Sequence, residues 1–265
     1  MIELNGISKT FKVAKRDAGA LASLKSLFHR EYDHVRALDN VSFKIESGEI
    51  VGYIGPNGAG KSTSVKVMSG ILVPDCGKCE CLGYTPWKKR REYVRNIGVV
   101  FGQRTQLWWD VPVIDSFWLL KGIYKVPDGE FKRNLDTLTE IMGLQDFVNT
   151  PLRQLSLGQR MRAEITASLL HSPKILFLDE PTIGLDAPSK LAVRQFVKDV
   201  NAQNKTTVII ATHDMNDIEA LTDRVILIGK GRILCDGSFS AIRNRFPSSL
   251  SSEEVIAELY KEHNL

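Results

Sequence analysis

A glycine-rich segment between a short apolar run and a helical pattern constrains the fold of this 265-residue chain more than any other feature. Residues Gly55–Thr63 read GPNGAGKST and match the pattern G-x-x-x-x-G-K-[ST]. The apolar run Ile50–Ile54 precedes them, and the pattern over Ser64–Ile71 predicts a helix directly after them. Such a strand–loop–helix unit is typical of a sheet with helices packed against it. The sequence therefore predicts an α/β fold.

The residue types of this segment suit the binding of a phosphate chain. Glycines let consecutive backbone N–H groups turn inward toward an anion, and the start of a helix adds its positive end. Lys61 supplies a mobile cation for the β- and γ-phosphates, and the hydroxyl of Ser62 is placed to bind Mg²⁺. We therefore predict a nucleotide site formed by Gly55, Pro56, Asn57, Gly58, Ala59, Gly60, Lys61, Ser62 and Thr63.

A second apolar run, Ile175–Asp179, ends in two neighbouring carboxylates. Buried parallel strands present their carboxyl ends to ligands at one edge of a sheet, which brings these acids to the phosphate-binding segment. We expect Asp179 to hold Mg²⁺ and Glu180 to polarise an attacking water as a general base. Together with the glycine-rich segment, this pair predicts a P-loop NTPase that hydrolyses its nucleotide.

Short β-forming runs alternate with longer helical patterns along most of the chain, which favours a partly parallel sheet. Between Gln103 and Pro173 the pattern changes, because apolar residues there recur at helical spacing. That stretch is expected to be an inserted helical subdomain, with helices over Val113–Tyr124, Phe131–Met142 and Leu157–Leu170. Further strands are expected at Ile2–Ile7, Val41–Ile45, Ile97–Phe101, Thr207–Ala211, Val225–Ile228 and Arg232–Cys235.

One of these helices begins with the sequence LSLGQ, at Leu155–Gln159. This segment resembles the LSGGQ signature of ATP-binding cassette (ABC) proteins. Three further motifs of that family stand in their usual order: Gln103 at the Q-loop, Ile183–Asp186 at the D-loop, and His213 at the switch histidine. The resemblance covers nearly the whole chain. It identifies the chain as similar to the ATP-binding proteins of ABC transporters.

The resemblance implies a fold and a division of the chain. The fold would be a RecA-like P-loop NTPase core with an antiparallel β subdomain and an inserted helical subdomain that carries the signature. A single nucleotide-binding domain would cover residues 1–265, with 1–102 and 173–237 as catalytic core and β subdomain, 103–172 as helical subdomain and 238–265 as a C-terminal helical tail.

The family also implies roles for single residues. Phe11 matches the position whose ring stacks on adenine, and Gln103 matches the one that senses Mg²⁺ and the membrane partner. Because one chain holds one copy of each motif, two chains are needed to close a composite site around ATP. The implied nucleotide contacts outside the glycine-rich segment are Phe11, Ser156, Gly158, Gln159 and Asp186. The implied catalytic set is Glu180, His213 and Gln103, and the implied metal ligands are Ser62, Gln103 and Asp179.

One signature position departs from the family pattern, because Leu157 stands where the consensus has glycine. If that position needs a positive φ, a leucine would be strained there; if glycine only avoids crowding, leucine is tolerated. LSLG signatures and the sequence VFGQRTQLWWD are similar to cassettes that pair with type-two exporter permeases. Only a short tail such as Glu253–Lys261 follows Gly237, unlike the large regulatory domain of several sugar importers. We therefore expect export.

The implied function is the ATPase subunit of a transporter, working as a dimer with a second copy or a related cassette on separate permease subunits. One rival is an ABC ATPase that acts on ribosomes or DNA, but such relatives carry two cassettes or a long coiled coil. Another is a soluble P-loop kinase, which would need neither LSLGQ nor His213. The net charge of +4 and the pI near 8.8 are only mildly basic, so no specific nucleic acid is expected.

No stretch of the sequence predicts a membrane span or a secretion signal. The longest run without Asp, Glu, Lys or Arg is Ile50–Gly60, which is far shorter than the ~20 apolar residues of a spanning helix. Met1–Lys9 lacks the apolar core of a signal peptide. We expect a cytoplasmic protein, peripheral on the cytoplasmic face of the cell membrane through its permease subunits.

Four local features allow two interpretations each. Cys76, Cys79 and Cys81 suggest a metal or redox site, but no second ligand pair is suitably spaced, and the alternation Cys79–Leu82 favours a plain strand. Residues 15–36 predict a basic amphipathic helix that contacts a membrane or packs on its own domain. Trp108 and Trp109 are either exposed anchors for a partner or core residues, and the sequence leaves both interpretations open. The basic run Lys88–Arg95 favours a solvated helix face over a lipid or nucleic-acid contact.

Overall fold

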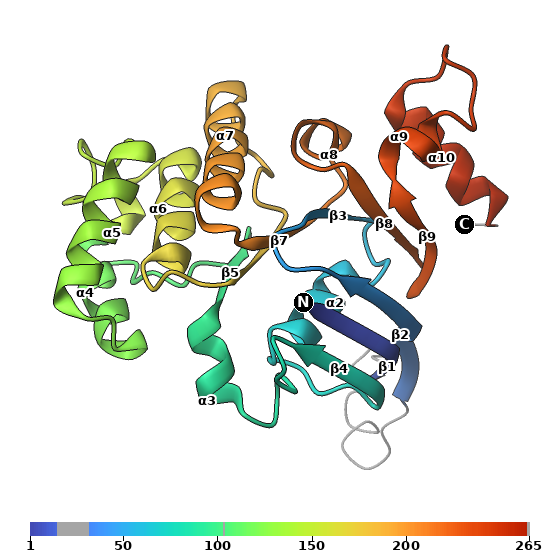
Figure 1. Cartoon of the computed structure of the whole chain (residues 1–265), viewed down its shortest axis with the longest axis horizontal. Helices are drawn as coiled ribbons and strands as arrows, with labels where there is room; N and C mark the ends of the chain where they lie inside the picture. Colours follow the sequence, from blue (N-terminus) through green and yellow to red (C-terminus); the bar gives the residue numbers. More distant parts are fainter. Residues whose placement is uncertain (15–31, 103, 264–265) are drawn as a thin grey trace, which may run out of the picture.

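The computed structural model describes residues 1–14, 32–102 and 104–263 (Figure 1). Its larger sheet has six strands in the order β5-β6-β7-β3-β8-β9. The pairs β5–β6, β6–β7, β7–β3 and β3–β8 are parallel, and β9 is antiparallel to β8. The bounds are β3 Ile50–Ile54, β5 Ile97–Phe101, β6 Ile175–Asp179, β7 Thr207–Thr212, β8 Arg224–Gly229 and β9 Arg232–Ser238. The expected partly parallel sheet is confirmed, with most strand ends within one residue.

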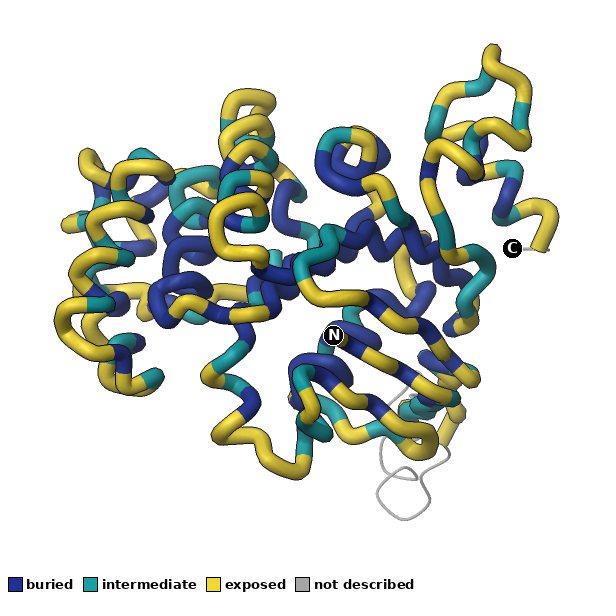
Figure 2. Tube along the Cα trace, viewed as in Figure 1, coloured by how far each residue is buried: buried dark blue, intermediate teal, exposed yellow. Residues whose placement is uncertain are grey.

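Alternation along the buried strands sends side chains to two different cores. In β6, Ile175 and Phe177 face the core that contains α2 (Lys61–Met68), while Leu176 and Leu178 face the core that contains α7 (Ala187–Asn204). A strand covered on both faces is therefore apolar throughout, as the sequence of β6 is. Figure 2 shows the resulting band of buried strands through the middle of the molecule.

A second sheet is antiparallel and has the order β2-β1-β4, with β1 Ile2–Ala14, β2 Tyr32–Ile45 and β4 Cys76–Cys81. It packs on the α2 face of the main sheet through Ile2, Leu4 and Phe43. The predicted strand around Cys79 is confirmed: Cys79 and Cys81 are buried on one face with their sulfurs 3.8 Å apart, and all four cysteines are free.

The expected helix over residues 15–36 is wrong at its C-terminal end. Residues 32–36 belong to β2, where Val35 pairs with Phe11 and His34 pairs with Lys12. Residues 32–36 are all exposed, and their pairing with Thr10–Ala14 of β1, a contact between distant parts of the chain, decides the strand conformation. Residues 15–31 lie outside the described residues.

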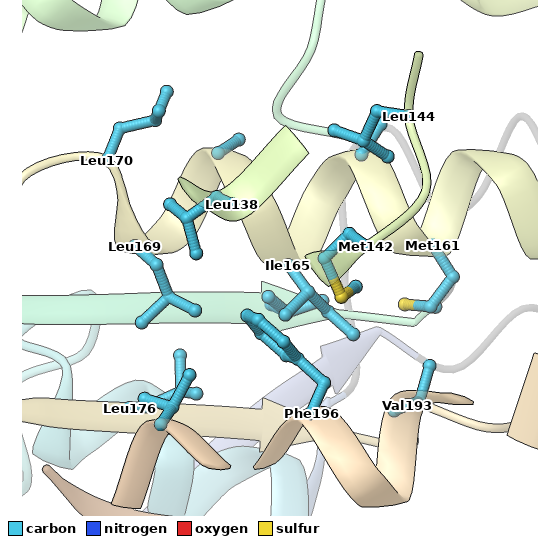
Figure 3. Packing of buried hydrophobic residues seen from close by; sticks show 14 of the residues in the cluster. Leu138, Met142, Leu144, Met161, Ile165, Leu169, Leu170, Leu176, Val193 and Phe196 are labelled. Carbon is cyan, nitrogen blue, oxygen red and sulfur yellow. The ribbon is translucent and has the colours of Figure 1, made fainter. Parts of the chain in front are cut away.

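Three α-helices and one short 3-10 helix, Leu152–Gln154, are described in the region between β5 and β6. The α-helices are α4 Val113–Tyr124, α5 Asp128–Ile141 and α6 Leu157–Leu169, close to the three predicted ranges. Figure 3 shows side chains of α5 and α6, such as Leu138 and Ile165, interlocked with Leu176 of β6 and Phe196 of α7. The helical region therefore shares one continuous apolar core with the sheet that carries Asp179.

Three further helices follow β7 in the described chain: α8 Met215–Leu221, α9 Phe239–Arg243 and α10 Ser252–Glu262. They bury a third apolar cluster against β8, in which Ile218, Ile242 and Val255 take part. The expected helical tail is thus a pair of helices after β9. Within the described ranges, none of the helices has the length and hydropathy of a transmembrane segment.

Candidate functional site

The glycine-rich segment connects β3 to α2 in the middle of the main sheet. Gly58 and Gly60 have φ of +81° and +111°, a region that side chains rarely adopt. At Gly60 a Cβ atom would also lie 2.6 Å from the carbonyl oxygen of Ala37. Glycine is therefore required where the chain turns into α2, and the backbone N–H groups of the turn can face an anion.

Lys61, the first residue of α2, folds back over the segment. Its side chain is only 6% exposed, and its Nζ donates to the carbonyl oxygens of Gly55 at 2.5 Å and Pro56 at 3.3 Å. The same Nζ lies 3.5 Å from Oε1 of Glu180. A buried ammonium held by two carbonyls and one carboxylate is well placed to bind a polyanion at the mouth of the loop.

Asp179 ends β6 on the face of the sheet that α2 covers. Burial raises the pKa of its carboxyl above the ordinary value, and a hydrogen bond from the Ser62 hydroxyl counteracts part of that effect. Its Oδ1 is buried and has no hydrogen-bond partner among the described residues. An orphaned carboxylate oxygen beside a hydroxyl fits a Mg²⁺ ion, which commonly binds one or two protein oxygens and completes its shell with phosphate and water.

Glu180 adopts a left-handed conformation, with φ of +55°, immediately after β6. Its N–H donates to the carbonyl oxygen of Ala211 at 2.8 Å, which ties the turn to β7. Its Oε1 lies 3.0 Å from Nδ1 of His213, the residue after β7. The structure thus brings together Lys61, Glu180 and His213 from three neighbouring strand ends, as expected for ligand groups in an open α/β sheet.

A cavity of about 530 Å³ lies over the glycine-rich segment. Seven of the nine predicted segment residues line it, Gly55 and Ala59 being the exceptions, and so do Phe11, Asp179 and Glu180. Six other lining residues were not predicted from the sequence: Ala37, Lys66, Ile71, Phe101, Gly102 and Arg104. Only Lys66 carried a signal, because it lies four residues after Ser62 and thus on the same face of α2.

The signature residues do not line this cavity in the described chain. Ser156 caps the N-terminus of α6 and exchanges hydrogen bonds with Gln159 in a capping box, at 2.9 and 3.2 Å. Asp186 caps α7, where it accepts from the N–H of Ser189 at 3.0 Å. Gln103 lies outside the described residues. The predicted nucleotide contacts thus fall into two groups, one around the cavity and one at the helix starts of α6 and α7.

Leu157 is the first residue of α6 and has no positive φ, so leucine causes no backbone strain in the signature. Its Cδ2 atom lies 2.8 Å from the position that a Cβ atom on Gly184 would occupy. Gly158 in turn packs against Ser189. A Cβ atom added to Gly158 would lie 2.5 Å from Oγ of Ser189. The signature therefore lies directly against the D-loop of the same chain, and Leu157 packs over it.

The remaining local features resolve as follows. Trp108 and Trp109 are 42% and 45% exposed, so the core interpretation is wrong, and Arg160 lies 4.9 Å from the ring of Trp109. The five cations of the basic run are all exposed, but only Arg90–Tyr93 of it forms an α-helix, α3. A second cavity, about 520 Å³ between α5 and α7, contains no predicted site residue.

Comparison with known proteins identifies the family. Residues 38–183 match the ABC transporter family model, which is more than half of the chain. The ABC transporter ATP-binding protein NatA of Bacillus subtilis is 32% identical over 78% of this chain and 84% of its own length. A linearmycin resistance ATP-binding protein of the same species is 31% identical over 82% and 69%. A methionine import ATP-binding protein of Geobacillus kaustophilus is 32% identical over 92% and 75%.

Solved structures agree with this match. The fold is shared with an ATP-binding subunit of an ABC transporter, with a TM-score of 0.79, 24% identity and coverage of 97% of this chain and 98% of the other. A dimeric ATP-binding cassette bound to ADP and Pi in a post-hydrolysis state has a TM-score of 0.75 and 25% identity over 90% and 98%. With the cavity, the carboxylates and the signature in place, this chain belongs to the ABC transporter family as an ATP-binding cassette that hydrolyses ATP.

Proposed function

We propose that this cassette drives a solute through separately encoded membrane subunits by closing on ATP and opening after hydrolysis. The observation that carries the proposal is the contact of Glu180 with His213 and Lys61 beside the cavity. A carboxylate in that position can orient a water and accept its proton, while the two neighbours hold the carboxylate in place. The ligand in the cavity would be ATP, with the ring of Phe11 beside adenine.

The predicted metal-binding and catalytic residues have separate tasks in this proposal. Mg²⁺, bound by Ser62, Asp179 and Gln103, would neutralise charge on the phosphates. Lys61 exchanges its carbonyl contacts for the β- and γ-phosphates, because an ammonium binds an anion more strongly than it binds neutral acceptors. Glu180 orients the attacking water, and His213 donates to the γ-phosphate.

A second copy, or a related cassette, would complete the site. Ser156, Gly158, Gln159 and Asp186 do not border the cavity of their own chain, but they present a helix start and a capping residue at one face. Facing another cassette, the start of α6 can donate N–H groups to the γ-phosphate bound there. ATP then holds the two chains together, and its hydrolysis removes that bridge.

We further propose that the transported solute is exported. The LSLG signature supports this direction, as does the similarity to a linearmycin resistance protein. The methionine import relative is equally similar, so identity alone does not separate the directions. Exposed Trp108 and Trp109 would anchor a membrane subunit at the segment after the Q-loop. The cassette would then sit on the cytoplasmic face of the membrane, with 1–102 and 173–237 as core and 103–172 as helical subdomain.

Substitution of Glu180 tests the chemical part of this proposal. Glu180→Gln keeps the shape of the side chain but removes the base, so the kcat for phosphate release should fall by about 10²- to 10⁴-fold. ATP binding, measured by calorimetry, should remain close to that of the unmodified chain. Turnover at the normal rate would remove Glu180 from the mechanism.

A further inference from the structure

Two ion pairs join α7 and α8, which lie side by side on the face of the main sheet opposite α2 (Figure 1). Nζ of Lys190 lies 2.6 Å from Oδ2 of Asp214, and Nη2 of Arg194 lies 2.6 Å from Oδ1 of Asp217. The two cations are four residues apart on α7, and the two acids are three residues apart at the start of α8. The two cations therefore lie on one face of α7, and the two acids lie on one face at the start of α8. The two ion pairs between them fix how the helices pack.

Asp217 is the buried member of this arrangement. It is fully buried, and Arg194 is only 15% exposed. Oδ1 accepts from Nε of Arg194 at 2.7 Å and also contacts Nη2, while Oδ2 accepts a hydrogen bond from the hydroxyl of Thr182. Removing one partner from a buried charged group is strongly unfavourable, so the three side chains hold one another in place.

These contacts connect the two segments that carry catalytic groups. Thr182 follows Glu180 by two residues, and Asp217 follows His213 by four. Glu180 has the positive φ described above, a conformation that persists only where the surroundings impose it. The Thr182–Asp217 hydrogen bond ties the loop after Glu180 to the helix after His213, within a few residues of the 3.0 Å contact between them.

We propose that Asp217 is a positioning residue for ATP hydrolysis: by binding Thr182 and Arg194 it keeps Glu180 and His213 in contact. Asp217 itself does not border the nucleotide cavity, so it acts only through the two catalytic side chains. The inference rests on the proposed roles of Glu180 and His213. It adds that α7 takes part in fixing their geometry, because Arg194 is the second anchor of the same carboxylate.

A hydroxyl deletion at Thr182 gives the cleanest test. Thr182→Val has almost the same volume but cannot donate to Asp217, whereas Thr182→Ser keeps the donor. We expect Thr182→Val to lower kcat by about three- to tenfold with the KM for ATP within about twofold, and Thr182→Ser to restore kcat. Thr222→Val is the matched control, because Thr222 is also buried but donates only to the backbone of α8, at 3.4 Å.

A double-mutant cycle separates positioning from a general loss of stability. In a His213→Ala background the contact is already gone, so adding Thr182→Val should change kcat less than twofold. If Thr182→Val lowers kcat equally in both backgrounds, or no more than Thr222→Val does, the inference is wrong. If His213→Ala alone leaves kcat unchanged, the proposed role of His213 fails first, which is a distinct result.

Asp217→Asn provides a second route to the same answer. Asparagine keeps the size of the side chain and can still accept from Thr182, but it loses the charge that binds Arg194. We expect a smaller fall in kcat than for Thr182→Val, again with little change in the KM for ATP. A normal kcat in Asp217→Asn together with a normal kcat in Thr182→Val would overturn the proposal, since both variants weaken the same anchor.

Discussion

At the scale of single residues, the site combines burial with strain. Asp179 is removed from water with one oxygen unpaired in the described part of the chain, and Glu180 holds a backbone conformation that suits glycine better. Both features cost free energy in the folded protein. The sequence identified both residues from their place after an apolar strand, but it carries no signal for the φ of Glu180, which neighbouring strand ends impose.

The buried carboxyl of Asp179 predicts a gain in stability when its charge is removed. Its pKa is raised in the folded state, so the folded protein loses stability as pH rises from the ordinary value of 3.8 to the raised one. Asp179→Asn should therefore raise the free energy of unfolding near pH 7 by about 1 kcal/mol while abolishing hydrolysis. Urea denaturation of the nucleotide-free chain measures the difference.

The pH dependence of the stability gain in Asp179→Asn distinguishes removal of a buried charge from a change in packing. Lowering the pH through the raised pKa protonates Asp179 in the folded protein, so the advantage of Asp179→Asn should shrink. Asp146→Asn is a suitable control, since Asp146 is exposed on the helical region and its loss should leave stability nearly unchanged. A stability gain that stays constant as the pH falls from 7 through the ordinary value of 3.8 would contradict the buried-charge explanation.

At the scale of elements, the start of α6 and the D-loop form one packed unit. Leu157 covers Gly184, which has a φ of +71°, and Gly158 lies against Ser189 of α7. The leucine that departs from the family signature, Leu157, therefore has a packing partner, because its side chain fills the space over Gly184. Sequence alone could only leave open whether Leu157 was strained.

This packing predicts the effect of a single methyl group. Gly184→Ala meets both an unfavourable φ and the Cδ2 of Leu157, whereas Gly83→Ala meets an equivalent φ of +78° with no neighbour within 4 Å. Gly83→Ala should cost about 1 kcal/mol of unfolding free energy, and Gly184→Ala should cost more. Leu157→Ala in the Gly184→Ala background should remove the excess. Equal costs for both glycine variants would show that Leu157 does not press on the D-loop.

The bounds of strands were predicted best from the sequence where a strand is buried on both faces. The strands β3, β5 and β6 match their expected ranges because an apolar run covered on both faces has little freedom at its ends. The prediction failed at β1 and β2, which extend to Ala14 and Tyr32 as a half-exposed ribbon. There the apolar residues are sparse, and only pairing between the strands, a contact between distant parts of the chain, decides the structure.

At the scale of the whole molecule, the predicted nucleotide contacts fall into two groups. The cavity is bordered by the glycine-rich segment and β6, while the signature and Asp186 lie at the starts of α6 and α7 outside its lining. The separation of the signature and Asp186 from the cavity could be inferred from the family motifs. The spacing of residues along the sequence does not predict it, because it depends on how the helical region packs on the sheet. In the proposed dimer, a pair of cassettes would bring the two groups together around ATP.

The mass of the Glu180→Gln variant with ATP tests this account most directly. Slow hydrolysis should trap the closed state, so light scattering should give about twice the 29.7 kDa of one chain with Mg²⁺ and ATP, and one chain's mass with ADP. Adding Lys61→Ala, which removes the phosphate-binding cation, should return the mass to that of one chain. A variant that binds ATP by calorimetry yet stays at 29.7 kDa at every protein concentration would contradict the shared site.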